Sequence, residues 1–349
     1  MLKILVTGGA GFIGSNFIIR SLNSLNCKIL NIDKLTYSGN LDNLNTIKNN
    51  PNYEFVKGDI GNSNLLNEII NNFNPDIIVN FAAESHVDRS IDSASDFIDT
   101  NILGTINLLD CCLEYWKINK NNNFKFIHIS TDEVYGTLGD EGSFDELSTY
   151  NPSSPYSASK ASSDHFVYSW YKTYGLPTII TNCSNNYGPF QFPEKLIPLM
   201  IINALNDKPL PIYGSGKNIR DWIHVKDHCD AIISIIEKGE IGEKYNIGGN
   251  CELQNIEIVN KICGILNELS PRKNGEPYNK LIEFVNDRPG HDYRYAVNFD
   301  KLSTSLGWLP QINFESGIKD TISWYIENSD WWETIIKNKY KLERLGHSK

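Results

Sequence analysis

A glycine-rich segment near the start of the chain constrains its fold more than any other feature. Gly8-Gly9-Ala10-Gly11-Phe12-Ile13-Gly14 follows an apolar, β-branched run at 3–7 and opens an amphipathic helical pattern at 12–25. In this spacing Gly8 permits a tight turn, Gly11 lets backbone N–H groups approach a diphosphate, and Gly14 lets the helix pack closely against the strand. The segment therefore predicts a strand–turn–helix unit that binds a dinucleotide.

The alternation of strand and helix patterns continues through the first half of the chain. Further short β-branched runs and the helical patterns between them lie at 28–33, 53–57, 63–73, 77–81, 96–116, 124–130, 156–174 and 178–181. Strands that alternate with helices form a parallel sheet covered on both faces. The predicted fold class is α/β, a doubly wound parallel sheet of the Rossmann type that spans 1–188.

The pattern changes after Gly188-Pro189, where prolines cluster and the regular alternation is lost. We expect a smaller C-terminal α/β lobe at 189–349. A helical pattern at 225–238, within the stretch 222–250, is expected to return to the first lobe. The polar residues after Trp331-Trp332 are expected to lack fixed structure.

Acidic and small residues after the predicted strands complete a dinucleotide site. Asp33 ends the second strand, 19 residues beyond Gly14, where a carboxylate accepts hydrogen bonds from ribose hydroxyls and repels a 2′-phosphate. NAD is therefore expected rather than NADP. Gly58-Asp59-Ile60 and Phe81-Ala82-Ala83-Glu84-Ser85 fit a wall around the adenine and ribose. The alternative is an accidental glycine-rich turn in an α/β protein that binds no nucleotide, and the combined strand, spacing and acid disfavour it.

Two sets of reactive side chains are expected at the ligand-binding edge of the sheet. Tyr156 and Lys160 lie one helical turn apart, where an ammonium can lower the pKa of a phenol that must accept a proton from a hydroxyl. Ser130-Thr131-Asp132-Glu133-Val134-Tyr135-Gly136 ends the fifth predicted strand. Two adjacent carboxylates there are costly to bury unless chemistry uses them, although one of them could instead face solvent as a turn residue.

These features belong to a longer series of motifs that covers nearly the whole chain. The series comprises the glycine pattern, Ala82-Ala83-Glu84-Ser85-His86-Val87-Asp88-Arg89-Ser90, Thr131-Asp132-Glu133, Tyr156 with Lys160, Ser184-Asn185-Asn186-Tyr187-Gly188-Pro189, Phe192-Pro193-Glu194-Lys195-Leu196-Ile197-Pro198, Arg220-Asp221-Trp222 and Asp287-Arg288-Pro289-Gly290-His291. In these motifs the sequence resembles the dTDP-glucose 4,6-dehydratases, members of the extended short-chain dehydrogenase/reductase group. One departure is Tyr293, which stands where the family is expected to carry a basic residue.

The resemblance implies a redox-neutral reaction that releases water and yields a 4-keto-6-deoxy sugar nucleotide. Tyr156, assisted by Lys160 and Thr131, would remove the proton of the hexose 4-hydroxyl while a hydride passes from carbon 4 to NAD. Glu133 would then abstract the carbon 5 proton and Asp132 would protonate the departing 6-hydroxyl, before the hydride returns to carbon 6. An epimerase that acts only at carbon 4 has no use for the two carboxylates, so Thr131-Asp132-Glu133 is the most discriminating motif.

The resemblance also implies a set of binding residues. Guanidinium groups suit the substrate diphosphate because they offer forked, permanently charged donors, although a surface ion pair is the alternative for either Arg220 or Arg288. The expected substrate contacts are Ser85, Thr131, Asn185, Lys195, Leu196, Pro211, Tyr213, Arg220, Asn255, Arg288 and His291. The expected NAD contacts are Gly8, Gly11, Phe12, Ile13, Gly14, Asp33, Lys34, Thr36, Asp59, Ile60, Phe81, Ala82, Ala83, Ser85, Thr100, Tyr156, Lys160 and Asn186.

Composition narrows the possible partners. The formal net charge is −10 and the sequence contains no long Lys/Arg run, so neither nucleic acid nor a membrane is an expected partner. The sequence shows no secretion signal, and its seven cysteines form no C-x-x-C pair, which favours reduced thiols in the cytoplasm. His224 and His228 are four residues apart in a predicted helix, but the sequence offers no third ligand, so we expect no metal site.

Other functions remain open from the sequence. A UDP-glucose 4,6-dehydratase would share the triplet and differ only in its nucleobase pocket, whereas a sugar-nucleotide decarboxylase would carry Ser at position 132. A non-catalytic NAD-binding protein would have lost part of the catalytic set, and all five residues are present. The helices predicted at 96–116 and 156–174 carry more apolar residues than one sheet contact needs, which favours a homodimer.

Overall fold

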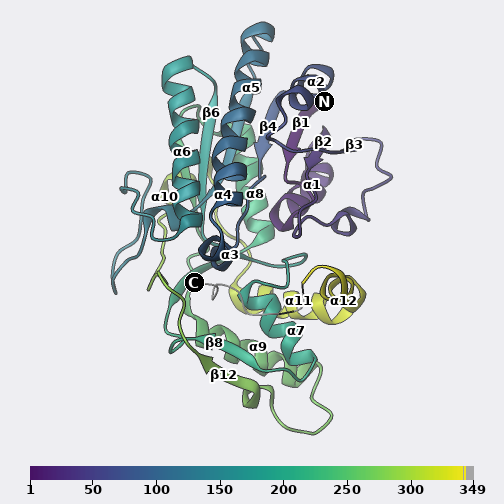
Figure 1. Cartoon of the computed structure of the whole chain (residues 1–349), viewed down its shortest axis with the longest axis vertical. Helices are drawn as coiled ribbons and strands as arrows, with labels where there is room; N and C mark the ends of the chain where they lie inside the picture. The colour runs from purple at the N-terminus through teal and green to yellow at the C-terminus, as the bar shows by residue number, and fades with distance from the viewer. Residues whose placement is uncertain (341, 343–349) are drawn as a thin grey trace.

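The β-branched runs form one seven-stranded sheet in the computed structural model, which describes residues 1–340 and 342 (Figure 1). The strand order is β3–β2–β1–β4–β5–β6–β10, and every pairing in this sheet is parallel. The order reverses at β1, which lies between β2 and β4, and open α/β sheets bind ligands at such a point. The strands are Leu2–Thr7 (β1), Cys27–Asp33 (β2), Tyr53–Lys57 (β3), Ile77–Asn80 (β4), Lys125–Thr131 (β5), Thr178–Cys183 (β6) and Lys244–Ile247 (β10).

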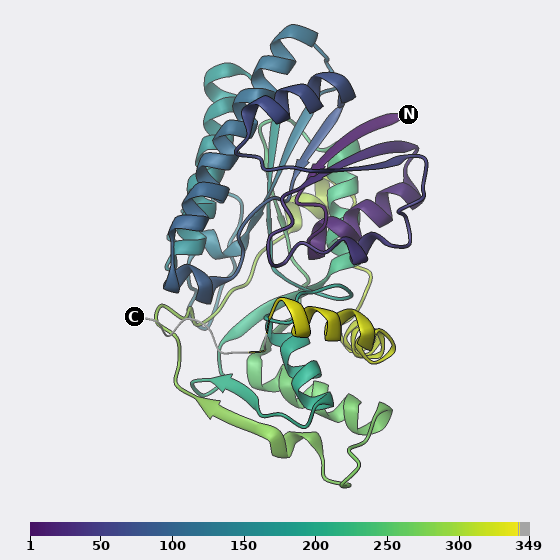
Figure 2. The same ribbon diagram turned by 45° about the vertical axis from the view of Figure 1, so that its right-hand side comes forward.

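Helices cover both faces of the sheet because alternate residues of each strand point to opposite sides. Ile4 and Val6 of β1 pack with α1 and α8 on one face, whereas Leu5 packs with α2, α5 and α6 on the other (Figures 1 and 2). All three side chains are buried, which explains the continuous apolar run in the sequence. The predicted fold class is confirmed. The helices are Phe12–Ser24 (α1), Ser63–Phe73 (α2), Thr105–Asn119 (α5), Pro155–Tyr174 (α6) and Val225–Lys238 (α8).

The helix predicted at 96–116 is interrupted by π-helical turns. A short helix, α4 (Ser95–Phe97), runs into a π-helix, η2 (Ile98–Gly104), before α5 begins. The wider turns bring the Asn101 amide against the chain after β4, where it accepts a hydrogen bond from Glu84 N at 2.8 Å and donates to Glu84 O at 3.0 Å. Such turns often occur at functional sites, and here they hold a wall of the cavity described below.

The second lobe packs two small sheets against four longer helices. A three-stranded sheet has the order β11–β9–β7, and β12 pairs in parallel with β8. The strands are Asn185–Tyr187 (β7), Leu210–Tyr213 (β8), Ile219–His224 (β9), Glu252–Gln254 (β11) and Ile282–Val285 (β12). The helices are Leu196–Leu205 (α7), Asn255–Leu269 (α9), Phe314–Glu327 (α11) and Ser329–Asn338 (α12), and the shorter ones in the chain are Leu41–Leu44 (η1), Val87–Asp92 (α3), Asp132–Tyr135 (η3), Tyr278–Leu281 (η4) and Asp300–Leu306 (α10).

The chain passes between the lobes more than once. After β9 it returns to the first lobe, where α8 packs beside α1 and β10 pairs with β6 at the edge of the large sheet. Later in the chain, α10 packs near α8 and β10, since Leu302 and Leu306 belong to the same core as Ile232. The lobes therefore interleave.

The expectation that the residues after Trp331-Trp332 lack fixed structure is wrong for the part that the structure describes. Residues 329–338 form α12, and Trp332 is buried against the second lobe. Trp331 also reaches the first lobe, where its indole Nε1 donates to Asn43 Oδ1 at 2.8 Å. Residues 341 and 343–349 lie outside the described part. Within that part, none of the helices has both the length and the apolar character that crossing a bilayer requires.

Candidate active site

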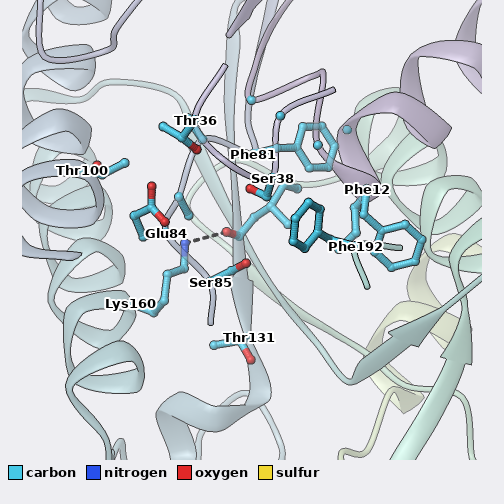
Figure 3. Close-up of a pocket in the computed structure, with 18 of the residues that line it drawn as sticks. Phe12, Thr36, Ser38, Phe81, Glu84, Ser85, Thr100, Thr131, Lys160 and Phe192 are labelled. Atoms are coloured by element: carbon cyan, nitrogen blue, oxygen red, sulfur yellow. Dashed lines mark hydrogen bonds between the residues drawn. The ribbon is translucent and has the colours of Figure 1, made fainter. Parts of the chain in front are cut away.

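A cavity opens at the carboxyl ends of the central strands, and every residue expected to contact NAD lines it (Figure 3). The five expected catalytic residues line the same cavity, as do Ser85, Asn185 and Lys195 from the expected substrate set. The segments that meet here are far apart in the sequence but adjacent in the sheet, because β1, β2, β4, β5 and β6 all end at this edge. The structure thus brings the cofactor and catalytic sets together.

The glycines shape one wall of the cavity in two different ways. Gly8 has φ +71°, and a Cβ there would lie 2.6 Å from Ala82 N; a Cβ on Gly14 would lie 2.5 Å from Gly8 O. These two glycines are required by the packing of the protein itself. A Cβ on Gly11 would meet a single atom of the described residues, Gly8 O at 3.3 Å, so its open side faces the cavity that a diphosphate would fill.

Asp33 presents a carboxylate at the end of β2. Its Oδ2 accepts from Ala10 N at 2.9 Å and its Oδ1 accepts from Leu35 N at 2.7 Å, so the carboxylate is held against the glycine turn. Burial raises its pKa, and these two backbone hydrogen bonds oppose that rise. The remaining lone pairs of the carboxylate can accept hydrogen bonds from ribose hydroxyls. NAD offers such hydroxyls, whereas the 2′-phosphate of NADP is negatively charged and would be repelled.

The segment 131–133 places two carboxylates in different environments. Thr131 ends β5, its Oγ1 accepts from Glu133 N at 3.3 Å, and the following residues make the 3₁₀ turn η3. Asp132 is 1% exposed, and burial, followed by the charges of Glu133 and Asp221, raises its pKa well above the ordinary value. Burial also raises the pKa of Glu133, which is partly exposed.

Nearby cations separate the pKa values of the two carboxyl groups further. Arg288, Lys195 and Arg220 lower the pKa of Glu133, in that order, whereas Arg220 is the cation that lowers the pKa of Asp132. Asp132 is therefore the carboxyl group suited to hold a proton, and Glu133 is the one suited to accept one. The alternative in which one of them is an exposed turn residue does not hold for the buried Asp132.

Tyr156 lies in the first turn of α6, a position fixed by local sequence. Ser154 caps the helix through reciprocal hydrogen bonds with Ser157, and Pro155 starts it. The expectation that the pKa of Tyr156 is lowered is wrong for this structure. Burial and then the charge of Glu133 raise that pKa well above its ordinary value, and a hydrogen bond with Thr131 opposes the rise.

Lys160 points instead toward the carboxyl end of β5. Its Nζ donates to Ile129 O at 2.8 Å and lies 3.3 Å from His128 Nε2, so its ammonium is engaged by the strand behind the cavity (Figure 3). Burial lowers the pKa of Lys160, and the nearby carboxylate of Asp164 raises it.

Most of the expected substrate residues from the second lobe lie beyond this cavity. Arg220 is buried, with its guanidinium stacked 4.3 Å over the Tyr295 ring and donating to Asp292 O at 3.0 Å. Arg288 pairs with the buried Asp88 at 2.8 Å. Neither arginine is in a surface ion pair, which removes that alternative. The others lie in or beside the small sheets and at helix starts, and they are Leu196, Pro211, Tyr213, Asn255 and His291.

The structure adds residues that were not expected. Ser38, Gln191, Phe192 and Glu194 line the cavity, and the aromatic rings of Phe12, Phe81 and Phe192 gather on one side of it (Figure 3). Glu194 is buried, accepts from the Tyr37 hydroxyl at 2.8 Å and pairs with Arg89 at 2.9 Å. Glu194 belongs to the sequence motif at 192–198, and a buried carboxylate needs hydrogen-bond donors or a positive charge beside it. The motif could therefore have indicated a role for Glu194.

Tyr295 was also missed, and no sequence motif marked it. It is buried and its hydroxyl donates to Asp292, and burial and then the charge of Glu133 raise its pKa. The neighbouring Tyr293 is exposed and donates to Asp140 Oδ1 at 3.0 Å. The departure from the family at position 293 therefore lies on the surface.

The two histidines lie in different elements and have different partners. His224 ends β9 and its Nδ1 accepts from Lys226 N at 3.2 Å, so the prediction that both histidines lie in one helix is wrong. His228 lies in α8, where its Nδ1 is 2.9 Å from Asn186 Oδ1. Among the residues that the structure describes, no three potential ligands of a metal ion gather.

Known proteins share this fold and these motifs. Residues 5–321 match the family model described as GDP-mannose 4,6 dehydratase. A probable dTDP-glucose 4,6-dehydratase from Sinorhizobium fredii is 56% identical over 348 residues, which is 99% of each chain. The structure of a dTDP-glucose 4,6-dehydratase from Bacillus anthracis in complex with NAD has a TM-score of 0.85 at 50% identity, over 96% of this chain and 100% of that one. A dTDP-glucose 4,6-dehydratase from Streptomyces venezuelae with NAD bound has a TM-score of 0.88 at 43% identity, with the same coverage.

Proposed function

The chain belongs to the dTDP-glucose 4,6-dehydratase family, and from that premise we propose that it converts dTDP-glucose to dTDP-4-keto-6-deoxyglucose and water with NAD as its cofactor. The observation that carries this proposal is the pair Asp132 and Glu133, two adjacent carboxyl groups whose environments separate their pKa values. An elimination needs one acid and one base on neighbouring carbons, and this pair supplies both.

The residues around the pair have distinct tasks in the proposed reaction. Tyr156 takes the proton of the sugar 4-hydroxyl, and Thr131 holds the phenol through their hydrogen bond. The ammonium of Lys160, one helical turn away on α6, would favour the phenolate. Bound NAD supplies a hydride acceptor for carbon 4 and a hydride donor for carbon 6. Once carbon 4 is a ketone, the carbon 5 proton is acidic enough for Glu133 to remove it, while Asp132 protonates the departing 6-hydroxyl.

The burial of Tyr156 bears on the order of these events. Because its pKa is raised, Tyr156 stays protonated in this structure and has to lose that proton before it can accept the one from the 4-hydroxyl. A positive charge beside the phenol, which oxidised NAD would supply, favours that loss, so we expect the base to form only when the cofactor is in place. Arg220 and Arg288, from the second lobe, would neutralise the substrate diphosphate. Both lower the pKa of Glu133, so the same cations hold the base ionised.

The choice of nucleotide follows the relatives, because the catalytic residues would serve UDP-glucose equally well. We propose dTDP-glucose, which is the substrate that the relatives' names state. The seven free cysteines suit a reducing compartment, in agreement with a cytoplasmic location.

A homodimer is proposed from the outer surface of two long helices. Ile98, Leu103 and Ile118 on η2 and α5, with Tyr168 and Tyr174 on α6, are exposed large apolar side chains. The two helices lie side by side on the same face of the molecule (Figure 1). Exposed apolar surface of this kind is suited to a symmetric contact with a second copy.

The test is to incubate the purified, NAD-loaded protein with dTDP-glucose and, separately, with UDP-glucose. Mass spectrometry should detect the loss of one water without net accumulation of NADH. The Glu133→Gln variant should lose the elimination by about 10²- to 10⁴-fold, whereas Glu141→Gln, an exposed loop control, should keep it. If both sugars return intact from folded, NAD-loaded protein, the proposal is wrong.

A further inference from the structure

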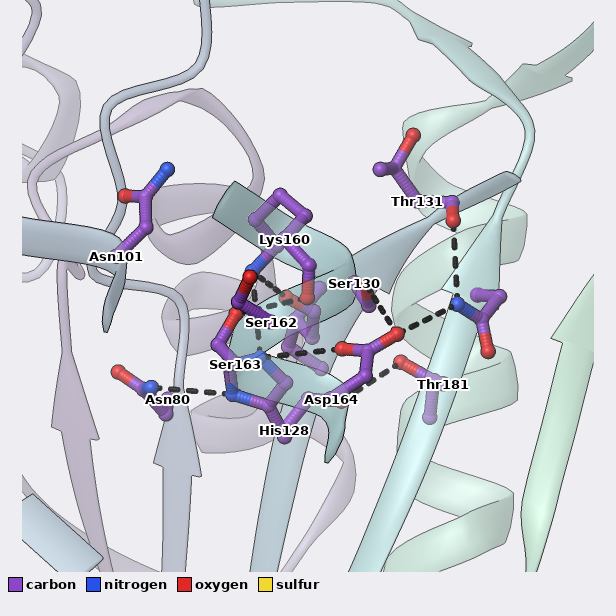
Figure 4. A network of polar contacts seen from close by, with 12 residues as sticks. Asn80, Asn101, His128, Ser130, Thr131, Lys160, Ser162, Ser163, Asp164 and Thr181 are labelled. Atoms are coloured by element: carbon purple, nitrogen blue, oxygen red, sulfur yellow. Dashed lines mark hydrogen bonds and ion pairs between the residues drawn. The ribbon is translucent and has the colours of Figure 1, made fainter. Parts of the chain in front are cut away.

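A buried polar network surrounds the ammonium of Lys160 (Figure 4). Asp164 is one helical turn beyond Lys160 on α6 and is 1% exposed. Its Oδ2 accepts from Ser130 Oγ and the Tyr150 hydroxyl, both at 2.8 Å, and from Asn182 Nδ2 at 3.1 Å. Burial raises the pKa of Asp164, and the charge of Lys160 and these three donors oppose that rise while the donors fix the carboxylate in place.

The ring of His128 stands between Asp164 and Lys160. Its Nε2 lies 3.4 Å from Asp164 Oδ1 and 3.3 Å from Lys160 Nζ, and the ring is fully buried on β5. Burial and then the charge of Lys160 lower the pKa of His128 well below its ordinary value, so the ring is neutral.

The other ring nitrogen determines which of the two carries the proton. Thr7 Oγ1 lies 2.6 Å from Asn80 Oδ1, which turns the amide nitrogen of Asn80 toward His128 Nδ1 at 3.2 Å. Because that nitrogen is a donor, His128 Nδ1 must accept, and the proton of the neutral ring is on Nε2. The Nε2–H can therefore be directed to Asp164 Oδ1, which has no other partner among the described residues.

This arrangement places a carboxylate near the buried ammonium of Lys160. Lys160 is 3% exposed, and a buried ammonium is strongly disfavoured unless a negative charge is near. Asp164 is the group that most raises the pKa of Lys160 against burial. Three other titratable groups interact with the charge of Asp164, and they are Tyr150 before α6, Tyr135 in η3 and Lys244 on β10. Tyr150 and Lys244 lie together on the outer side of the network.

We propose that Asp164 and neutral His128 are positioning residues that hold the ammonium of Lys160 charged and directed along β5 for the hydride-transfer steps. Asp164 supplies the charge, and the His128 ring fixes the spacing between the carboxylate and the ammonium. Among the described residues, neither Asp164 nor His128 forms a hydrogen bond or ion pair with Glu133, so the elimination step should not depend on them. This inference rests on the proposed role of Lys160 in hydride transfer.

The Asp164→Asn variant tests the charge with little change of shape. In this variant, the rate at which dTDP-glucose reduces bound NAD should be measured by stopped flow as a function of pH. The alkaline limb of that pH–rate profile should move to lower pH by about one unit, so that the rate above the limb falls about tenfold. Deuterium exchange at carbon 5 of the 4-keto product, which needs Glu133 but no hydride transfer, should be unchanged. Tyr150→Phe removes one hydrogen bond to Asp164 and keeps its charge, so its limb should stay near that of the wild type.

A pair of substitutions at His128 gives an independent test that does not require Asp164→Asn to fold. Gln keeps an N–H for Asp164, whereas Leu fills similar space without one. His128→Gln should keep most of the hydride-transfer rate and His128→Leu should lose it, with both retaining carbon 5 exchange. Equal rates in the two variants, or an unmoved limb in Asp164→Asn, would overturn the inference.

The Lys160→Met variant separates this inference from the proposed function. If Lys160→Met keeps wild-type hydride transfer, the proposed role of Lys160 fails and the inference fails with it. If Lys160→Met loses hydride transfer while Asp164→Asn keeps its pH profile, only the inference fails.

Discussion

Separate substitutions of Gly11 and Gly14 should affect different properties, mainly NAD binding for Gly11 and mainly stability for Gly14. Both glycines belong to the same turn, but an added methyl group would meet different surroundings. At Gly14 it would lie 2.5 Å from Gly8 O and 2.8 Å from Gly9 Cα, which are backbone atoms that cannot turn aside. At Gly11 it would lie 3.3 Å from Gly8 O and otherwise point into the cavity.

The expected magnitudes follow from these distances. Overpacking at Gly14 costs about 1–3 kcal/mol, and the better helix propensity of Ala returns about 1 kcal/mol, so Gly14→Ala should be destabilised by up to about 2 kcal/mol. Gly11 is the N-cap of α1 with φ −77°, a conformation open to Ala, so Gly11→Ala should lose about 1 kcal/mol or less. The methyl group there would displace a phosphate oxygen from a backbone N–H, which is worth about 1.5–3 kcal/mol, or about 10- to 160-fold in Kd for NAD.

Urea unfolding of the NAD-free proteins and calorimetric titration with NAD would measure the two effects. We expect Gly11→Ala to unfold close to the wild type and to bind NAD weakly, and Gly14→Ala to unfold earlier. NAD bound by Gly11→Ala with wild-type affinity would refute the assignment of this turn to the diphosphate, whatever its stability.

Three further outcomes are expected. Asp33→Asn should weaken NAD and raise the affinity for NADP relative to it, because the charge that repels a 2′-phosphate is gone; an unchanged ratio in competition titrations would contradict this. Burial lowers the pKa of His228 to about 3, so the unfolded chain binds a proton that the native one does not as the pH falls below about 6.5, and the free energy of unfolding should fall by about 1.4 kcal/mol per pH unit from this group. Urea titrations at pH 7 and pH 5 should show a shallower decline in His228→Gln, and an equal decline would count against it. Leu103→Glu, on a side chain 55% exposed on η2, should give a monomer by sedimentation velocity, whereas Leu147→Glu, 93% exposed in a loop, should stay dimeric; a dimer in both would place the interface elsewhere.

The parts of the site that could be predicted are those that the chain encodes locally. The glycine turn, Asp33 and the Tyr156–Lys160 spacing each lie within one strand–helix unit, so their positions follow from sequence separation and strand polarity. The triplet at 131–133 follows from the strand before it, because Phe126, Ile127 and Ile129 are apolar and buried in β5. The family resemblance and the fold class are confirmed on the same grounds.

What could not be predicted depends on contacts between distant segments. β10 is a short strand that acquires its place by pairing with β6, and Tyr295 becomes relevant because Arg220 stacks on it. The pKa of Tyr156 was misjudged because burial, which no spacing reveals, is the largest cause of its rise. The π-helical turns of η2 also have no local sequence mark and are explained by the hydrogen bonds of Asn101 to residue 84.

The reach of α12 back to the first lobe has a consequence for biosynthesis. Trp331 donates to Asn43, and Lys339 Nζ donates to Gly39 O at 2.7 Å, so the loop that follows β2 is held by residues synthesised 288 and 300 positions later. A ribosome-bound chain can form the early sheet, yet the loop beside Asp33 receives these contacts only after residue 339 has emerged. Nascent chains stalled before that point should therefore expose this loop to protease, whereas chains stalled after residue 339 has emerged should protect it.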